Sequence, residues 1–336
     1  MRASVLVTGG TGFIGRHTVD ALVAAGHRVR CLCRSDEPAL TQAGAEVVRG
    51  DVLIKDSVAR ALDGIELVVH GAGLVSRAAE DTGLMMKLHV TGTRHVVELA
   101  CEQGVQRIVH LSTSGTVAVG NDPTMVYRED DAVPLKALSR FPYYLSKWLG
   151  ERVAEDCVRS KKTQLVTLNP SLALGPGDTR GSSTTDVKRF LDRELPIVPS
   201  GGFSLVDARD VATVVVAALE QGRPGERYLL GALNTTFADF FLRLSQVSGV
   251  AGPYLSIPLP PRLATFGIGF LERAANLVGA KIPVTAMEAE MASSFWYVDN
   301  RKAERALGFA PRDPMITLLD TVKDLRSQGK REKRVG

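Results

Sequence analysis

A tyrosine and a lysine stand four residues apart in FPYYLSK, residues 141–147. On a helix, residues i and i+4 lie one above the other, so Tyr143 meets Lys147, whereas Tyr144 is rotated away by about 100°. Pro142 suits a helix start, because its missing N–H would be unpaired there in any case. A cation close to a phenol favours tyrosinate, so this pair could move a proton. Tyr143 is therefore the candidate for chemistry, although a chain with six tyrosines can contain such a pair by chance.

Three glycines recur at three-residue spacing in VLVTGGTGFIG, residues 5–15. Gly9 permits a tight turn, Gly12 lets the backbone approach a pyrophosphate, and Gly15 allows close helix packing. Phe13 and Ile14 then fall at the N-terminus of the following helix, where N–H groups and a partial positive charge attract phosphate. The pattern predicts dinucleotide binding. Its spacing differs from the GxGxxG of the longer dehydrogenases.

Short apolar runs alternate with longer amphipathic segments through the first half of the chain. The runs are ASVLVTG, HRVRCLC, EVVRGDV, LVVHGAG, RIVHLSTS and QLVTLNPS. This alternation predicts an α/β fold, a doubly wound parallel sheet with helices on both faces. Gly26 and Gly104 each follow a helical pattern, as C-terminal caps do, and Gly308 should end a helix begun at Asp299 or Asn300.

The alternation of short apolar runs with helical segments stops after about residue 170. This change predicts two structural parts followed by a C-terminal tail. We expect residues 1–170 plus 204–232 to form the nucleotide-binding domain. Residues 171–203 plus 233–330 should form a smaller, mostly helical C-terminal substrate-binding part over the sheet's carboxyl edge, where ligands bind in such sheets. Residues 331–336 read as a basic tail.

Bulk composition narrows the function classes. The chain has 336 residues, and its net charge of +4 is modest, with basic residues interspersed among acids, so no nucleic-acid partner is expected. The four cysteines lack metal-ligand spacing, so no metal site is expected. No apolar run reaches the ~18 residues that span a bilayer, and the N-terminus enters a strand pattern directly. We expect a soluble, cytoplasmic protein.

The order of motifs along the chain resembles the extended short-chain dehydrogenases/reductases of the NAD-dependent epimerase/dehydratase superfamily. The matching segments are TGGTGFIG, GDV at 50–52, HGAG at 70–73, LSTSGTVA at 111–118, Tyr143-x-x-x-Lys147 and NPSLALGPGD at 169–178. The passages LVDARDVA and VDNRKAERALGF are similar to the dihydroflavonol-reductase-like and 3β-hydroxysteroid-type members. The resemblance implies a Rossmann fold and an NAD(P)-dependent oxidoreductase.

The resemblance also implies the catalytic residues. It points to Ser114, with Thr113 as second choice, as the hydroxyl that holds a substrate carbonyl beside Tyr143. A turn-stabilising serine is the alternative for Ser114. Lys147 is implied to bind the nicotinamide ribose. With an ordinary pKa of ~10, a tyrosine that acts as a base at neutral pH needs about 4 kcal/mol of differential stabilisation, part of which Lys147 could supply.

Cofactor identity depends on the end of the second strand. Where NAD-preferring relatives carry a carboxylate, this chain has Cys33 followed by Arg34, which favours NADP (NADPH), with NAD as the alternative. Asp51 is expected to accept a hydrogen bond from adenine, a solvent-facing aspartate being the other reading. The residues assigned to the cofactor are Gly9, Gly12, Phe13, Ile14, Gly15, Arg34, Asp51, Val52, Gly71, Ala72, Gly73, Tyr143, Lys147 and Pro170.

One position departs from the family pattern. Relatives carry asparagine in an Asn-Val-x-Gly-Thr segment, whereas this chain reads HVTGT with His89. A structural hydrogen-bonding role is the default for such a histidine, and a place in the pocket wall is the alternative.

Together these features favour an NADPH-dependent reductase of a ketone or aldehyde. Two alternatives stay open, a nucleotide-sugar epimerase with bound NAD and a non-catalytic NADP-sensing protein. A dehydratase would need an acid–base pair at Gly115 and Thr116, which carry no acid. The apolar stretch 255–284 could form a substrate lid, which favours a mostly apolar or aromatic substrate. The expected partner is a small carbonyl compound, with a homodimer left open.

Overall fold

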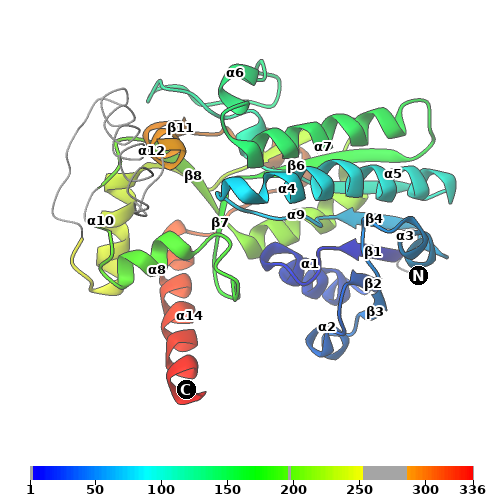
Figure 1. Ribbon diagram of the computed structural model, residues 1–336, viewed down its shortest axis with the longest axis horizontal. Coiled ribbons are helices and arrows are strands. Elements are labelled where there is room, and N and C mark those ends of the chain that lie inside the picture. The colour runs from blue at the N-terminus through cyan, green and yellow to red at the C-terminus, as the bar shows by residue number, and fades with distance from the viewer. Residues whose placement is uncertain (1–2, 196–197, 253–285, 336) are drawn as a thin grey trace.

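A seven-stranded parallel sheet dominates the computed structural model, which describes residues 3–195, 198–252 and 286–335 (Figure 1). The strand order is β3-β2-β1-β4-β5-β6-β9, so the direction of winding reverses between β1 and β4. This confirms the predicted doubly wound Rossmann sheet. The strands are β1 (Ser4–Thr8), β2 (Arg28–Cys33), β3 (Glu46–Arg49), β4 (Leu67–His70), β5 (Arg107–Leu111), β6 (Gln164–Pro170) and β9 (Arg227–Leu230).

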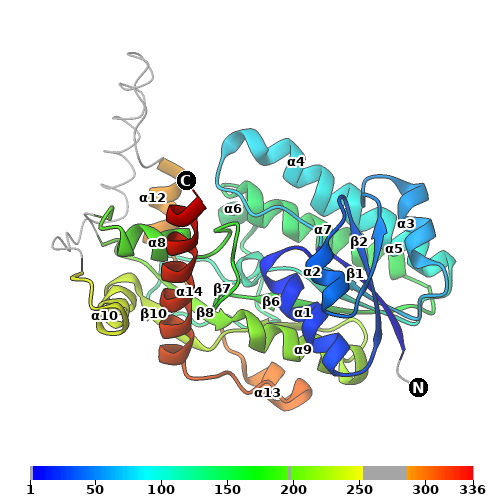
Figure 2. The same ribbon diagram turned by 90° about the horizontal axis from the view of Figure 1, so that it is seen from below.

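Helices cover both faces of this sheet because its strands are apolar on both sides. Along β1, Val5 and Val7 pack into the core that α1 (Phe13–Ala24) and α9 (Ala208–Gln221) complete, whereas Leu6 packs on the opposite face. The helices of that opposite face are α3 (Lys55–Leu62), α5 (Thr93–Glu102) and α7 (Pro142–Val158). Figure 2 shows α1 and α9 together on one side, with α3 and α5 on the other.

A second, smaller sheet stands beyond the carboxyl edge of the first. Its strands are β7 (Leu172–Leu174), β8 (Gly202–Asp207), β10 (Leu233–Thr236) and β11 (Phe295–Trp296), all paired to β8. Within residues 204–232, β8 pairs in the smaller sheet, while α9 and β9 pack on the large one, and the division into domains stays a prediction. The smaller part is thus not built from helices alone.

The remaining helices complete the chain. They are α2 (Pro38–Gln42), η1 (Ala79–Asp81), α4 (Thr82–Met86), the π-helix η2 (Lys87–Gly92), η3 (Ser114–Thr116), α6 (Leu135–Leu138), α8 (Thr185–Leu191), α10 (Phe237–Ser248), α12 (Ala286–Ser293), α13 (Arg301–Leu307) and α14 (Pro314–Val335). Among the described helices, none is both long enough and apolar enough to cross a membrane. The suggested lid at 255–284 lies outside the described residues.

Several predicted helix ends are confirmed by left-handed glycines. Gly26 and Gly104 follow α1 and α5 with φ of +80° and +76°, and Gly308 ends α13 with φ of +64°. Asn300 precedes α13, as one of the two predicted starts. The basic residues beyond position 330 continue the backbone of α14 as far as Val335.

Candidate active site

The glycine turn after β1 is built from direct backbone contacts. A Cβ on Gly15 would lie 2.0 Å from the Gly9 carbonyl oxygen, so only glycine lets α1 approach the turn. Gly9 has φ of +79°, and a Cβ there would lie 2.6 Å from the Gly71 carbonyl carbon. No side chain caps the N-terminus of α1 at Gly12. The free N–H groups of Phe13 and Ile14 therefore fit the phosphates of a dinucleotide.

Adjacent strand ends bring three predicted motifs to one edge. β4 lies between β1 and β5, with Thr8 opposite His70 and His70 opposite His110. The glycine turn, the loop at Gly71 and the segment around Thr113 therefore emerge side by side. Helix α7 packs against the same edge, because the Lys147 Nζ donates a hydrogen bond of 2.6 Å to the carbonyl oxygen of Leu111, the last residue of β5.

Tyr143 and Lys147 occupy one face of α7, as their spacing requires, and Pro142 is the first residue of that helix. The side chain of Thr113 lies close enough to the Tyr143 phenol to lower its pKa. Ser114, the first choice from the sequence, is buried one residue further on in η3. The structure thus brings Tyr143, Lys147 and Thr113 together, and it places Ser114 beside them, although only Thr113 acts on the pKa of Tyr143.

Burial changes the proton affinities of this group. It raises the pKa of Tyr143, and the side chain of Thr113 opposes the rise only in part. From the sequence, we expected Lys147 to supply part of the stabilisation of tyrosinate. In the structure the pKa of Tyr143 is raised, because burial is the largest effect and Tyr144 adds to it. Burial also lowers the pKa of Lys147 to about 8, with Glu151 acting in the opposite direction. Tyr143 is therefore a protonated phenol at neutral pH.

His89 is a structural hydrogen-bonding residue in this arrangement. Its Nε2 accepts a hydrogen bond of 3.1 Å from the Leu74 N–H, which leaves the ring hydrogen on Nδ1, 2.8 Å from the Ser146 hydroxyl. A Cβ on Gly73 would lie 2.7 Å from His89 Nε2, so the last glycine of HGAG makes room for this ring. The ring also contacts Tyr143 edge-on, with centroids 5.9 Å apart. His89 therefore packs against Tyr143, the candidate catalytic tyrosine.

Aromatic side chains surround the other side of Tyr143. The ring of Tyr144 lies 5.1 Å from that of Tyr143 and 4.7 Å from that of Trp296, which belongs to β11. A Cβ on Gly115 would lie 2.3 Å from Tyr144 Cε1, so the tyrosine ring occupies the space beside this glycine. The contribution of Trp296 could not be found from the sequence, because about 150 residues separate it from Tyr144.

The predicted nucleotide-specificity residues lie at the ends of β2 and β3. Cys33 is buried, whereas Arg34 is exposed and makes no ion pair with any other described residue. One Asp51 carboxylate oxygen accepts a hydrogen bond of 2.9 Å from the Leu53 N–H, which fixes the loop and leaves the other oxygen available.

Two more predicted cofactor residues are buried. A Cβ on Gly92 would lie 3.0 Å from Val52 Cγ2, and Pro170 ends β6 opposite Leu230. Ala72 donates its N–H to the Thr8 hydroxyl at 3.2 Å, which ties the β4 loop to β1. These residues shape the same edge of the sheet.

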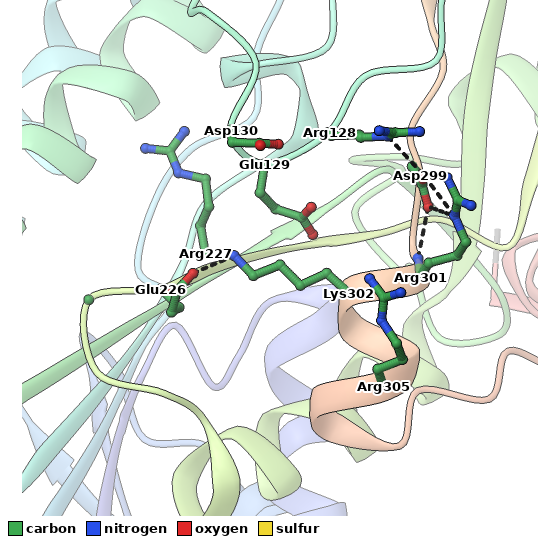
Figure 3. A pocket seen from close by; sticks show the side chains of 10 residues that line it. Arg128, Glu129, Asp130, Glu226, Arg227, Asp299, Arg301, Lys302 and Arg305 are labelled. Carbon is green, nitrogen blue, oxygen red and sulfur yellow. Dashed lines mark hydrogen bonds and ion pairs between the residues drawn. The ribbon is translucent and has the colours of Figure 1, made fainter.

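A charged pocket of about 690 Å³ lies apart from these residues, and no predicted site residue lines it. Figure 3 shows it between the loop of Arg128, strand β9 and helix α13, with Lys302 paired to Glu226. It is lined by Arg128, Glu129, Asp130, Gly225, Glu226, Arg227, Asp299, Arg301, Lys302 and Arg305. Because most of its cations already have carboxylate partners, we do not assign it a ligand.

Comparisons with known proteins show which proteins the chain is similar to. A family model described as NAD dependent epimerase/dehydratase family matches residues 5–231. The chain is 31% identical over 334 residues to sterol demethylase protein B of Methylococcus capsulatus, covering 97% of this chain and 99% of the relative. It is 27% identical to 4-hydroxy-2-methyl-3-oxo-4-farnesyl-3,4-dihydroquinoline-1-oxide ketoreductase of Stigmatella aurantiaca, covering 96% of each. The crystal structure of gox2253 is similar, with a TM-score of 0.85, 30% identity, and coverage of 98% of this chain and 99% of that one.

Proposed function

This chain belongs to the NAD dependent epimerase/dehydratase family, and we propose that within it the protein is an NADPH-dependent reductase of a ketone or aldehyde. The chain is an NAD(P)-dependent oxidoreductase by its family, so the proposal concerns the direction, the cofactor and the substrate. The observation that supports this proposal is that Tyr143, Thr113 and Lys147 lie together at the end of β5, next to the glycine turn.

The chemistry follows from a phenol that holds its proton. When bound, the reduced nicotinamide supplies a hydride to the carbonyl carbon. Tyr143 donates its phenolic proton to the carbonyl oxygen, which completes the alcohol, and the phenol then regains a proton from solvent. Thr113 hydrogen-bonds the same oxygen and orients it. The phenol of Tyr143 is protonated at neutral pH, and reduction consumes this protonated form.

Arg34 supports NADPH over NADH. Its guanidinium is exposed at the end of β2 and carries no carboxylate partner among the described residues. A guanidinium matches a phosphate group as a two-pronged donor, whereas the buried thiol of Cys33 offers no acceptor to a ribose 2′-hydroxyl in place of a carboxylate. In this proposal the N–H groups of Phe13 and Ile14 hold the pyrophosphate, Asp51 meets adenine and Lys147 meets the nicotinamide ribose.

The wall beside Tyr143 supports an apolar or aromatic substrate. The rings of Tyr144 and Trp296 lie next to Tyr143, with their centroids 4.7 Å apart, and aromatic rings pack better against flat apolar groups than against a sugar diphosphate. The names of two relatives point the same way, since one refers to a sterol and the other to a farnesylated quinoline ketone.

A test of the proposal is incubation of the protein with NADPH and a panel of ketones and aldehydes, following the absorbance of the reduced cofactor. We expect turnover of bulky apolar or aromatic ketones. Conversion of nucleotide sugars without added cofactor, and no oxidation of NADPH with any carbonyl compound, would replace this function by that of an epimerase.

A further inference from the structure

A carboxylate is fully buried one helical turn beyond Lys147. Glu151 has 0% of its surface exposed, and it shares the inner face of α7 with Lys147 because four residues separate them. A buried charge is costly unless it is paired and hydrogen-bonded. The partners of Glu151 therefore indicate what this charge does.

One oxygen of Glu151 belongs to a hydrogen-bond network around Thr113. Glu151 Oε1 lies 3.0 Å from the Thr116 hydroxyl and 2.8 Å from Asn169 Nδ2. Both of these groups also lie 3.0 Å from the Thr113 carbonyl oxygen. The Asn169 amide has two hydrogens, enough for one bond to Thr113 and one to Glu151. The carboxylate thus fixes the backbone of the residue whose side chain lies close to Tyr143.

The other oxygen of Glu151 faces a cation from the sheet. Glu151 Oε2 lies 3.2 Å from the Arg227 guanidinium, and Arg227 is the first residue of β9. In Figure 3, the Arg227 guanidinium points away from the pair of Glu226 and Lys302. Arg227 also lies 3.7 Å from Glu155, and the Arg152 guanidinium lies 3.9 Å from the same oxygen of Glu151.

Lys147 has neutral neighbours apart from Glu151. The titratable groups near its ammonium are His70 of β4, His89 of η2, His110 of β5, and Tyr143 and Glu151 of α7. Burial, reinforced by the charge of Lys147, lowers the pKa of His70 to about 3 and that of His89 to about 2, and it lowers the pKa of His110 as well. Within the described part of the chain, Glu151 is the anion that acts on Lys147.

We propose that Glu151 is a positioning residue of the reaction: its carboxylate orders the backbone that carries Thr113 and supplies the negative charge that balances Lys147. The inference rests on the proposed reductase function, since Thr113, Tyr143 and Lys147 have their roles there. Glu151 touches neither carbonyl substrate nor cofactor in this scheme, and it acts through two residues that do.

The charge is tested with Glu151→Gln, which keeps an oxygen acceptor for Thr116 and Asn169 and removes the anion. Loss of a nearby anion lowers the pKa of the lysine, so the alkaline limb of kcat/KM should move from about pH 8 toward lower pH by about one unit. The matched control is Glu155→Gln on the same helix. Glu155 also lies within 3.7 Å of Arg227 but does not contact Thr116 or Asn169, so its variant should keep the native limb.

The ordering role is tested with Glu151→Asp, which keeps the charge and shortens the side chain. This variant should retain the alkaline limb of the native enzyme while kcat falls roughly tenfold, because a small misplacement of catalytic groups is costly. An unchanged pH profile in Glu151→Gln, or an equal shift in Glu155→Gln, overturns the inference.

Failure of the proposed function is recognised separately. If the native protein reduces no carbonyl compound, the same variants are compared by the pH dependence of NADPH binding, measured by fluorescence of the reduced nicotinamide. Binding should weaken at lower pH in Glu151→Gln than in the native protein, because Lys147 loses its proton earlier. Identical binding curves for the native protein and Glu151→Gln contradict the role of Glu151 whatever the substrate is.

Discussion

The side chain of Thr113, two residues beyond the end of β5, lies close enough to the phenol of Tyr143 in the first turn of α7 to lower its pKa. Lys147 makes a second connection one turn later, through the carbonyl oxygen of Leu111. The helix is therefore held against the strand at two successive turns. This arrangement presents a phenol and a hydroxyl together at the edge of the sheet where ligands bind.

Tyr143→Phe tests the proton donor. We expect kcat for ketone reduction to fall by about 10² to 10⁴, because general acid catalysis is lost, while NADPH still binds. The matched control is Tyr144→Phe, which removes a phenol hydroxyl from the neighbouring residue and keeps its ring against Trp296. Steady-state kinetics and NADPH fluorescence measure the two effects. Comparable loss of kcat in the two variants would contradict the assignment of Tyr143.

Thr113→Ala and Ser114→Ala decide between the two candidate hydroxyls. The side chain of Thr113 acts on the pKa of Tyr143, so Thr113→Ala should lower kcat/KM by about tenfold to a hundredfold, as expected for a lost bond of ~1.5 to 3 kcal/mol to a developing charge. Ser114→Ala should have a smaller effect, and Thr113→Ser should recover most of the activity. A larger loss of kcat/KM in Ser114→Ala than in Thr113→Ala would assign the orienting hydroxyl to Ser114.

How much of this site could be predicted from sequence depends on whether its contacts are local. The pairing of Tyr143 with Lys147 follows from helical periodicity, and the contact of Gly15 with Gly9 follows from a local turn. The choice between Thr113 and Ser114 does not follow from local sequence. Adjacent residues after a strand point in different directions, and their orientation depends on how the chain enters η3.

Contacts between distant segments account for what the sequence did not indicate. Trp296 reaches Tyr144 only because β11 pairs with β8 in a sheet that forms beyond the first one. Strand β9 was not among the predicted strands, since it is four residues long and follows a turn at Gly225. The pairing of β8 in the smaller sheet likewise involves segments far apart in the chain. Such pairings depend on the whole fold and leave no periodic signal nearby.

Arg34→Ala tests the cofactor preference. Removing a charge-assisted bond to the 2′-phosphate should raise KM for NADPH by about tenfold to a hundredfold, while KM for NADH stays nearly unchanged. Because Arg34 is exposed and has no ion pair with another described residue, the variant should fold as the native protein does. Kinetics with both cofactors measure the ratio. Equal changes in the two KM values would remove Arg34 from cofactor selection.

The burial of His70 and His89 predicts that the free energy of unfolding of the protein falls at acid pH. Burial lowers the pKa of His70 to about 3 and that of His89 to about 2, so both rings stay neutral in the folded state while the unfolded chain binds protons below pH ~6.5. Stability is therefore complete above that pH and falls as pH decreases toward the folded-state values. At pH 5 each ring should cost about 2 kcal/mol relative to pH 7.

His89→Asn isolates one of these contributions, because asparagine does not titrate and is the residue that relatives with the Asn-Val-x-Gly-Thr segment carry. Its free energy of unfolding at pH 7 should be lower than that of the native protein, since the bond from the Leu74 N–H is disturbed. The loss between pH 7 and pH 5 should nevertheless be smaller by about 2 kcal/mol. Urea unfolding at the two pH values measures both quantities. An equal loss in the two proteins would show that His89 binds a proton in the folded state, in contradiction to its burial between Ser146 and Leu74.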